Sequence, residues 1–386
     1  MPPNNHAVLS ASSSHRWLHC PPSIRLCEKY ADKSSSYAAE GTDAHELCEF
    51  RLKELLGIKA ENPIENLSYY NEEMEDCANG YAGYVLELVE ETKQNCKDPI
   101  ILIEQRVDFS RWVVDGFGTA DCVIVGDETL RIVDYKHGLG VEVSAENNPQ
   151  MMCYALGALE LFDYIYDIEK VSMTIYQPRR DNISTYEMSK NELFAWADET
   201  LKPTAELAYK GEGEFNCGDW CGFCKAKYEC RKRAEVNLEL AKYEFSLPPT
   251  LTDEDIEEIL GTINNLISWG ADIKEYALTR AMRGKKWTGF KLVEGRSNRK
   301  YINDDAVANA VINIGEDPYE KKLLGVTAMQ KLLGKTKFNE VLSPYIEKPA
   351  GKPTLVLTSD KRQEMNINTA AMDFNEMPST ERKEEN

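Results

Sequence analysis

The stretch RIVDYKHG, residues 131–138, combines the pattern of a buried strand with two opposite charges. Ile132 and Val133 are typical of an interior strand, and Asp134 and Lys136 follow them at alternate positions. Alternate side chains of a strand point to the same face and lie about 7 Å apart. The sequence therefore predicts an acid and a base side by side where a sheet strand ends.

The segments on either side of this stretch predict an α/β core. Asp127 and Glu128 are typical of the short polar link of a hairpin, and Pro149 suits the first turn of a helix. The predicted order is helix, three strands, helix and strand, at residues 72–95, 101–109, 118–126, 129–136, 146–163 and 171–178.

The character of the sequence changes after about residue 245. One long amphipathic helix, or two, is predicted over residues 251–282, opened by a Thr-x-x-Glu-like cap, and two short helical segments follow around 305–346. From about residue 348, small, proline and charged residues predominate, which is typical of a flexible tail. We therefore expect a first domain, a helical accessory domain and a tail, at residues 1–240, 245–347 and 348–386.

The composition is that of a globular protein with a strongly acidic surface. The 386 residues carry a formal net charge of −20, which argues against a general polyanion binder. Contact with nucleic acid must therefore come from local basic patches or a bound metal. The chain has no apolar run long enough for a membrane helix, and its start lacks the pattern of a signal peptide. We expect no membrane association and a cytoplasmic location.

Two carboxylates are expected to converge at the hairpin. Asp121 lies on its first strand and Asp134 on its second, so both can reach a common site. Two converging carboxylates repel each other unless they bind a divalent cation or share a proton. With Lys136 beside them to position a water, the set suits metal-assisted phosphodiester hydrolysis. The alternative is a solvated strand end with a local ion pair.

Three spaced motifs resemble those of the PD-(D/E)XK nuclease superfamily: Gly118-x-x-Asp121, Asp134-x-Lys136 and Gln150-x-x-x-Tyr154. The most similar branch is the RecB-like one, which includes AddB and the CRISPR-associated exonucleases, and a phage and prophage family shares this fold. The resemblance implies a core in which helices flank a mixed sheet, with a mainly helical C-terminal accessory domain. It also implies metal-dependent cleavage of DNA, most characteristically as an exonuclease.

The same resemblance implies a site for Mg²⁺ or Mn²⁺. Members of this branch carry a histidine on an upstream helix, and His45 takes that place here, with Thr42 or Asp43 available as a helix cap. An imidazole ligand favours Mn²⁺ over Mg²⁺. Glu104 on the first strand adds a further carboxylate, unless it is an exposed strand charge. The implied ligands are His45, Asp121, Asp134, the carbonyl of Tyr135 and, in addition, Glu104.

The remaining motif residues have implied supporting roles. Lys136 would position the attacking water, while Gln150 and Tyr154 lie four apart on one helical face and would support the site and the bound strand. One departure from the family pattern concerns the middle acid, because many relatives carry Glu where this chain has Asp134, which is one carbon shorter.

A group of cysteines within residues 217–230 indicates a second metal site. The spacing Cys221-x2-Cys224-x5-Cys230 is similar to that of the iron–sulfur members of the branch, in which a fourth cysteine lies far upstream. The resemblance thus implies a [4Fe–4S] cluster held by Cys20, Cys221, Cys224 and Cys230, which would join both ends of the nuclease domain. Four thiolates also suffice for zinc. The alternative is a zinc site made by Cys217, Cys221, Cys224 and Cys230.

A basic segment, residues 280–301, reverses the acidic character of the chain. It holds eight basic residues, one acid and three interleaved aromatics. Basic groups follow a phosphate backbone and aromatic rings offer stacking faces, so the segment is a candidate DNA contact. The alternative is a solvated surface whose aromatics pack inward. The candidate residues are Lys285, Lys286, Trp287, Arg296 and Arg299.

Together these patterns predict a metal-dependent DNA nuclease, an exonuclease by resemblance, that acts in phage or prophage DNA recombination or replication. Its expected partners are DNA and phage recombination or replication proteins, in the cytoplasm of a bacterial host cell. Two alternatives stay open. The chain could be a non-catalytic DNA-binding or assembly protein on a nuclease fold, or a zinc-stabilised structural protein.

Overall fold

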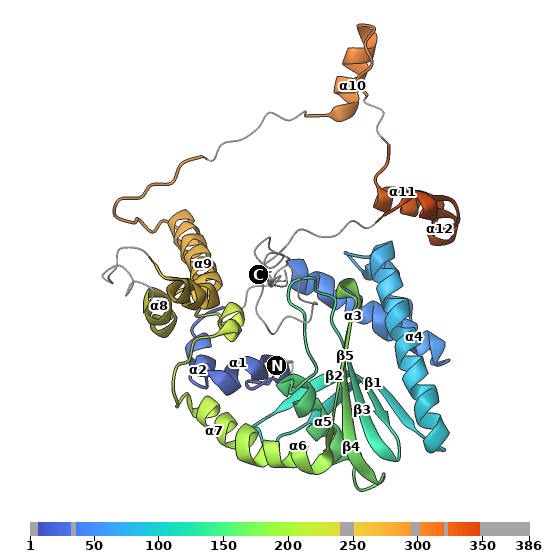
Figure 1. The fold of residues 1–386 in the computed structure, drawn as a ribbon, viewed down its shortest axis with the longest axis vertical. Helices are drawn as coiled ribbons and strands as arrows, with labels where there is room; N and C mark the ends of the chain where they lie inside the picture. The colour runs from blue at the N-terminus through green and yellow to red at the C-terminus, as the bar shows by residue number, and fades with distance from the viewer. Residues whose placement is uncertain (1–6, 32–35, 240–250, 295–301, 320–322, 348–386) are drawn as a thin grey trace, which may run out of the picture. The chain divides into compact units, whose positions relative to one another are not determined.

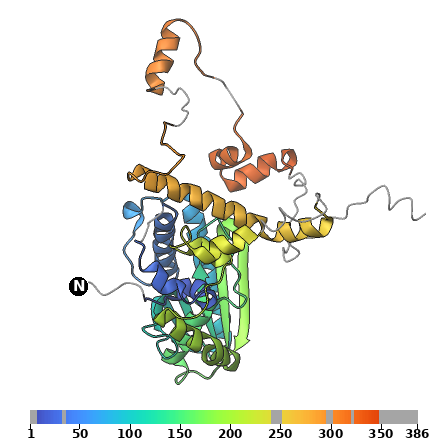
Figure 2. The same cartoon turned by 90° about the vertical axis from the view of Figure 1, so that its left-hand side faces the viewer.

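The computed structural model describes residues 7–31, 36–239, 251–294, 302–319 and 323–347 (Figures 1 and 2). Its internal contacts divide the chain into two units, Met1–Lys285 and Lys286–Asn386. The division falls after the long helix α9, Asp253–Met282, whereas the sequence predicted a boundary before it. Among the described residues, no helix is both long and apolar enough to cross a membrane.

A five-stranded mixed sheet forms the centre of the first unit. Its strands lie side by side in chain order, and every neighbouring pair is antiparallel except β3 and β4, which are parallel. Parallel neighbours need a crossover connection, and helix α5, Pro149–Phe162, supplies it. The strands are β1 (Ile100–Asp108), β2 (Phe117–Val125), β3 (Glu128–Tyr135), β4 (Ile168–Gln177) and β5 (Asn182–Ser189).

The predicted order of helix, three strands, helix and strand is confirmed. Helix α4 covers Glu72–Asn95, because the Asn71 side chain caps it by accepting from the Met74 N–H and acidic residues fill its first turn. Helix α5 begins at Pro149, where the Asn148 side chain accepts from the next two N–H groups. The edge strand β5 was not predicted from the sequence.

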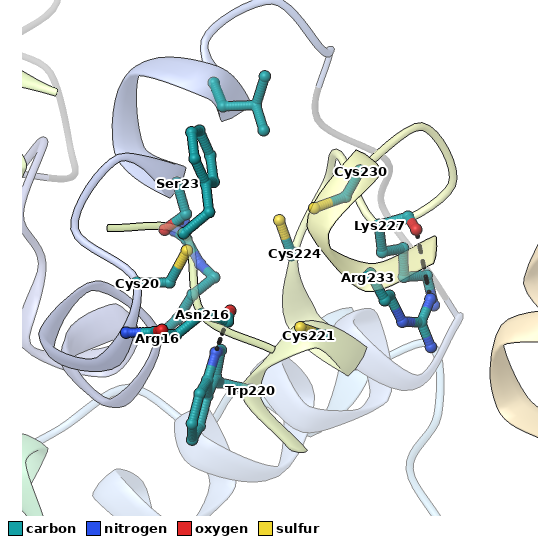
Figure 3. A pocket seen from close by; sticks show the side chains of 12 residues that line it. Arg16, Cys20, Ser23, Asn216, Trp220, Cys221, Cys224, Lys227, Cys230 and Arg233 are labelled. Atoms are coloured by element: carbon teal, nitrogen blue, oxygen red, sulfur yellow. Dashed lines mark hydrogen bonds between the residues drawn. The ribbon is translucent and has the colours of Figure 1, made fainter. Parts of the chain in front are cut away.

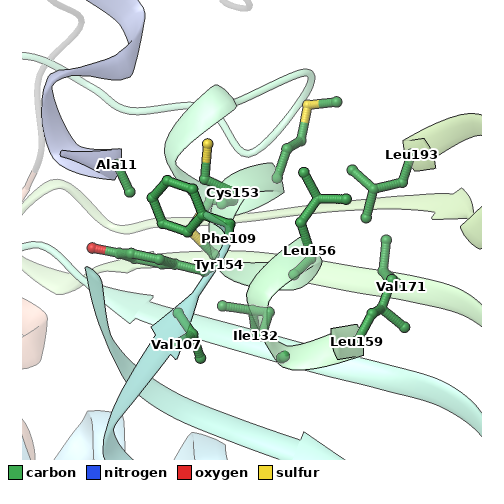
Figure 4. Close-up of a cluster of buried hydrophobic side chains, with 14 of the residues drawn as sticks. Ala11, Val107, Phe109, Ile132, Cys153, Tyr154, Leu156, Leu159, Val171 and Leu193 are labelled. Carbon is green, nitrogen blue, oxygen red and sulfur yellow. The ribbon is translucent and has the colours of Figure 1, made fainter. Parts of the chain in front are cut away.

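Helices cover both faces of the sheet. On one face, Leu156 and Leu159 of α5 lie in one apolar cluster with Val107, Ile132 and Val171 of the strands (Figure 4). On the other face, helices α3 (Ser36–Leu55) and α4 bury a second apolar cluster against β2 and β3. The sheet core is therefore α/β, with helices flanking a mixed sheet.

Partway along β1 and β2, alternate side chains change from one face of the sheet to the other. Ile103 on β1 belongs to the α3–α4 cluster, whereas Val107, an even number of residues later, belongs to the α5 cluster. The same exchange occurs on β2 between Cys122 and Ala120. Glu104 lies at the point of exchange with φ of 50°, a left-handed conformation that costs a non-glycine residue about 1–3 kcal/mol. This local break redirects side chains at one position of the sheet.

Short helices precede and follow the sheet in the first unit. Helix α3 begins at Ser36, so Thr42 and Asp43 lie inside it and the prediction that one of them caps it is wrong. The Thr42 hydroxyl instead donates to the Ala38 carbonyl, and the Asp43 carboxylate accepts from the Tyr69 N–H. The other helices are α1 (Ser14–His19), α2 (Ser23–Cys27), α6 (Lys190–Trp196), α7 (Lys202–Lys210) and α8 (Arg231–Leu238).

Helix α9, Asp253–Met282, is one continuous helix capped by Thr252 and Asp255. It packs on α8, where the buried Arg233 guanidinium pairs with Asp272. A buried ion pair with good geometry is costly to break from one side, so it fixes α9 beside the end of the cysteine segment.

The second unit contains helices where the sequence predicted two short helical segments. The described helices there are α10 (Asp304–Asn313), α11 (Val326–Leu333) and α12 (Lys335–Leu342). The predicted tail, residues 348–386, lies outside the described residues, as do Arg296 and Arg299.

Candidate active site

Asp121 and Asp134 lie on neighbouring antiparallel strands. Cys122 of β2 pairs with Val133 of β3, so the next position along the hairpin brings the two aspartates opposite each other. Asp134 is 2% exposed, which is rare for a carboxylate without a strong partner. The predicted convergence of the two acids is therefore present in the fold.

His45 and Glu104 join Asp121 in a compact group. Each of the three side chains offers one ligand atom, and these atoms all lie within 4.8 Å of one another. The Nδ1 atom of His45, on α3, is 3.4 Å from Oδ2 of Asp121. Glu104 on β1 lies opposite Asp121 on β2. Its backbone is left-handed, at the position where the side chains of β1 change faces of the sheet. The group thus draws on one helix and two strands.

Asp134 contacts a different set of side chains. Its Oδ2 forms an ion pair with Nζ of Lys136 at 2.8 Å, and its Oδ1 accepts from Nε2 of Gln150 at 3.1 Å. The same amide nitrogen donates to the Tyr154 hydroxyl at 3.1 Å, so α5 supports the acid through two residues. Lys136 also donates to Oε1 of Gln150 at 3.4 Å. Asp134 on β3, Lys136 just after it, and Gln150 and Tyr154 on α5 are therefore brought together as predicted.

Gly118 makes room for this support. A Cβ atom at residue 118 would lie 2.7 Å from Cε1 of Tyr154, which is closer than real Cβ contacts allow. A larger residue at this position would therefore displace the tyrosine ring from Gln150. The first sequence motif therefore has a steric need for glycine at residue 118.

The charges of the site are strongly coupled. Burial alone would lower the pKa of His45, but Asp121 outweighs it and raises that pKa to about 9. Burial, and then repulsion by Asp121, raises the pKa of Glu104 to about 7. Burial opposes ionisation of Asp121, yet His45 keeps the pKa of Asp121 below its usual value. Burial also raises the pKa of Asp134, and Lys136 offsets this only in part. The fold concentrates negative charge that it does not fully neutralise.

The donor set fits a hard or borderline divalent cation. Carboxylate oxygens with one imidazole suit Mn²⁺ and Mg²⁺. In addition, Oδ2 of Asp134 is buried and makes no hydrogen bond among the described residues, although the Lys136 ammonium is its ionic partner. Tyr135 donates its backbone N–H to Asp121 at 2.7 Å. The role of its carbonyl as a ligand stays a prediction.

A polar network that was not predicted holds α3 against the sheet. The buried Tyr135 hydroxyl lies 2.8 Å from Nδ1 of His137, and Nε2 of His137 lies 3.4 Å from Glu40 of α3. Arg179, after β4, pairs with Glu40 at 3.0 Å. The ring of His45, farther along α3, meets the edge of the Tyr135 ring. No spacing in the sequence indicates these contacts, because they join three separate parts of the chain.

The predicted cluster cysteines meet at a second site, between the N-terminal helices and the loop before α8. One pocket is lined by Cys20, Cys221, Cys224 and Cys230, and Cys20 lies on the side of the pocket opposite the other three (Figure 3). Asn216 donates to the carbonyl of His19 at 3.0 Å and so joins the two segments beside the thiols. The four predicted cluster ligands are therefore brought together, whereas Cys217 is absent from the lining of this pocket.

Two more cysteines lie next to this set. The sulfur of Cys27, at the end of α2, is 3.6 Å from that of Cys224, and the sulfur of Cys217 is 3.9 Å from that of Cys221. Contact with Cys224 lowers the pKa of Cys27 to about 6, and Arg16 contributes in the same direction. Cys27 was not predicted, because nothing in its local sequence distinguishes it from a helical core residue.

The basic segment is only partly described. Lys285 and Lys286 are exposed, Trp287 is half-buried and Phe290 is 81% exposed. The described part thus offers exposed cations with one exposed aromatic ring, but its role in binding DNA stays a prediction.

Comparison with known proteins assigns the chain to a family. The model of a family described as "Protein of unknown function (DUF2800)" matches residues 6–363. The chain belongs to this family. A solved structure titled "Crystal structure of SSO0001" is also similar, with 17% identity over 48% of this chain and 94% of that chain. Its TM-score of 0.22 is too low to carry an argument about fold or function. The DUF2800 description itself names no activity.

Proposed function

We propose that this DUF2800 protein is a metal-dependent deoxyribonuclease with a PD-(D/E)XK core of the RecB-like branch. The observation that carries the proposal is the meeting of Asp121, Asp134 and Lys136 at one place in the sheet. Helix α3 adds His45 to this place and α5 adds Gln150. A solvated strand end would not need a buried acid, so the ion-pair alternative accounts poorly for Asp134.

The residues divide the work of phosphodiester hydrolysis in this proposal. Asp121, Asp134, His45 and Glu104 would hold Mn²⁺ or Mg²⁺. When bound, such a cation neutralises charge on the phosphate and lowers the pKa of a bound water. Lys136, fixed by Asp134 at 2.8 Å, donates a hydrogen bond that orients the attacking water. Gln150 and Tyr154 keep Asp134 in place and face the bound strand.

The proposal includes a [4Fe–4S] cluster held by Cys20, Cys221, Cys224 and Cys230, and the cysteine pocket is the observation that supports it. These residues come from the N-terminal helices and from the loop before α8, and they line one pocket. Thiolate ligation there would tie these two segments together, as metal ligation does in other small sites. The zinc alternative needs Cys217 in place of Cys20, and the pocket lining favours Cys20.

The proposed substrate is DNA, reached through local positive charge. With a net charge of −20, the chain attracts phosphate only where cations gather, and Lys285 and Lys286 are exposed. Phage DNA recombination or replication, in the bacterial cytoplasm, is the proposed setting. An exonuclease is the proposed mode.

The test is a digestion of end-labelled DNA by protein purified without oxygen. We expect cleavage with Mn²⁺ or Mg²⁺ and none with a chelator. Lys136→Ala should abolish it, while Lys170→Ala, which removes an exposed strand lysine paired with Glu187, should not. Iron and zinc analysis of the same sample identifies the cluster. A well-folded protein that binds DNA and never cuts it would favour the non-catalytic alternative.

A further inference from the structure

Two thiols lie beside the proposed cluster ligands without belonging to them. Cys217 and Cys221 are neighbours in one loop, at 3.9 Å between sulfurs. Cys27 and Cys224 are 197 residues apart in sequence, and yet their sulfurs are 3.6 Å apart. The second pair therefore joins the same two segments, the N-terminal helices and the cysteine loop, that the proposed cluster joins.

The surroundings of Cys27 differ from those of a cysteine that only fills space. Cys122 and Cys153 are fully buried in the apolar layers on either side of the sheet. Cys27 is 5% exposed, but Nη1 of Arg16 is 3.6 Å from its sulfur. Arg16 thus gives this sulfur a polar neighbour, which a cysteine packed only among apolar side chains lacks. Cys224 is half-buried, so a small oxidant can approach it.

We propose that Cys27 and Cys224 are a reversible oxidation site, which a peroxide converts to a disulfide when the cluster is absent. Hydrogen peroxide transfers one oxygen atom to the Cys224 thiol and leaves as water, which gives a sulfenic acid. The Cys27 sulfur then attacks that sulfur, and a second water leaves. The sum is two thiols and one peroxide to one disulfide and two waters, so atoms and electrons balance.

The disulfide would replace the lost cluster as a link between the two segments. Sulfur atoms in van der Waals contact need to approach by little more than 1.5 Å to reach bonding distance, which a change of side-chain rotamer can supply. The bond also protects Cys224, because a sulfenic acid without a neighbouring thiol proceeds to the irreversible sulfinic acid. A dithiol reductant would restore both thiols and allow the cluster to form again.

This inference rests on the proposed assignment of Cys224 as a cluster ligand, but its first test does not. Full-length metal-free protein is treated with an equivalent of hydrogen peroxide, blocked, digested and mapped without reduction. We expect a cross-linked peptide containing Cys27 and Cys224, which dithiothreitol removes. The melting temperature of the oxidised full-length protein should rise by roughly 5–10 °C relative to the reduced metal-free protein. Recovery of Cys224 as sulfinic acid, with Cys27 still free, would overturn the proposal.

A second measurement compares three proteins after peroxide, reduction and reconstitution with iron and sulfide. Wild-type protein and Cys217→Ser should recover most of their iron, whereas Cys27→Ser should lose at least half, because its Cys224 has been oxidised irreversibly. Before peroxide, all three should hold equal iron, which shows that neither serine removes a ligand. Equal recovery in all three overturns the protective role. A cross-link in a protein that binds zinc and no iron overturns the cluster assignment and supports the disulfide site.

Discussion

The two candidate sites are held together by different means. The carboxylate site is built on β2 and β3, whose backbones are fixed by ladder hydrogen bonds, and it is braced by α3 and α5. The cysteine pocket is built from the ends of short helices and a loop, joined by single contacts such as Asn216 to His19. The first site is therefore preorganised without a ligand, whereas the second, in our proposal, depends on one.

This contrast separates activity from stability. A change in the carboxylate site should remove cleavage and leave the fold, since the sheet holds its shape. A change in the cysteine pocket should weaken the fold first, because in our proposal ligation adds a connection between the N-terminal helices and the cysteine loop.

The largest expected effect is that of Asp134→Asn on cleavage. Loss of an anionic ligand should reduce the rate of DNA cleavage by about 10³-fold or more, the range expected for metal-assisted hydrolysis. Burial raises the pKa of Asp134, so the folded state disfavours its charge at neutral pH. The neutral amide should therefore leave the melting temperature of the metal-free protein unchanged or raise it.

The matched control for this substitution is Asp127→Asn. Asp127 is an exposed residue in the link between β2 and β3, outside the site. The Asp127→Asn protein should cut DNA at the wild-type rate and melt at the wild-type temperature. If Asp134→Asn unfolds the protein, the sheet does not hold the site on its own, and the contrast between the two regions fails.

The next effect is that of Cys20→Ser on stability. Removal of the proposed upstream ligand should strip the protein of iron and lower its melting temperature by roughly 5–10 °C, because the cluster no longer joins the N-terminal helices to the cysteine loop. Absorbance, iron analysis and a thermal melt under anaerobic conditions measure both. Cys217→Ser serves as the control and should keep the iron. A colourless protein with one zinc, sensitive to Cys217 and indifferent to Cys20, would reverse the assignment.

A smaller effect is expected from Gly118→Ala. The added Cβ would meet the Tyr154 ring at 2.7 Å, so the ring and Gln150 must shift away from Asp134. A misplacement of this size should reduce the cleavage rate about tenfold and leave the iron content unchanged. Gly83→Ala on α4 is the control, because nothing lies within 4 Å of its Cβ position. A wild-type rate in Gly118→Ala would show that the Tyr154 contact does not position the acid.

Local signals explain which parts of this fold were predictable. Helix α4 covers 72–95 as predicted, because caps and apolar periodicity are properties of neighbouring residues. Helix α5 has Pro149 in its first turn as predicted, although it begins there and not at 146. The opposition of Asp121 and Asp134 follows from one short hairpin. Strand β5 escaped prediction because an edge strand alternates between half-buried and exposed positions and has no apolar run.

The missed contributions depend on the tertiary fold. Glu104 itself was expected as a further carboxylate, but no alternation pattern reveals the exchange of faces at its left-handed backbone, which brings it to His45 and Asp121. Cys27 meets Cys224 across 197 residues of sequence, and Glu40 meets Arg179 between separate elements. Resemblance to a family identified the motif residues, but it could not identify neighbours that lie outside the motifs.

The smallest predicted effect is a pH dependence that comes from Glu104. Its pKa is raised in the folded metal-free protein from 4.5 to about 7, so the folded state favours the protonated form. The contribution to stability is complete below pH 4.5 and declines as the pH rises through about 7, because folded Glu104 must then carry an unfavourable charge. Thermal melts of metal-free protein between pH 5 and pH 8 measure the decline.

Glu104→Gln should flatten this part of the stability profile, because a neutral amide has no proton to lose. At pH 8 the metal-free variant should melt above the wild type, and Mn²⁺ should raise the melting temperature of the wild type more than that of the variant. Glu128→Gln is the control, since Glu128 is exposed at the far end of β3. An equal decline in wild type and Glu104→Gln would place the titrating group elsewhere. Glu104 would then be an ordinary strand charge, and the preorganised site would contain one carboxylate fewer.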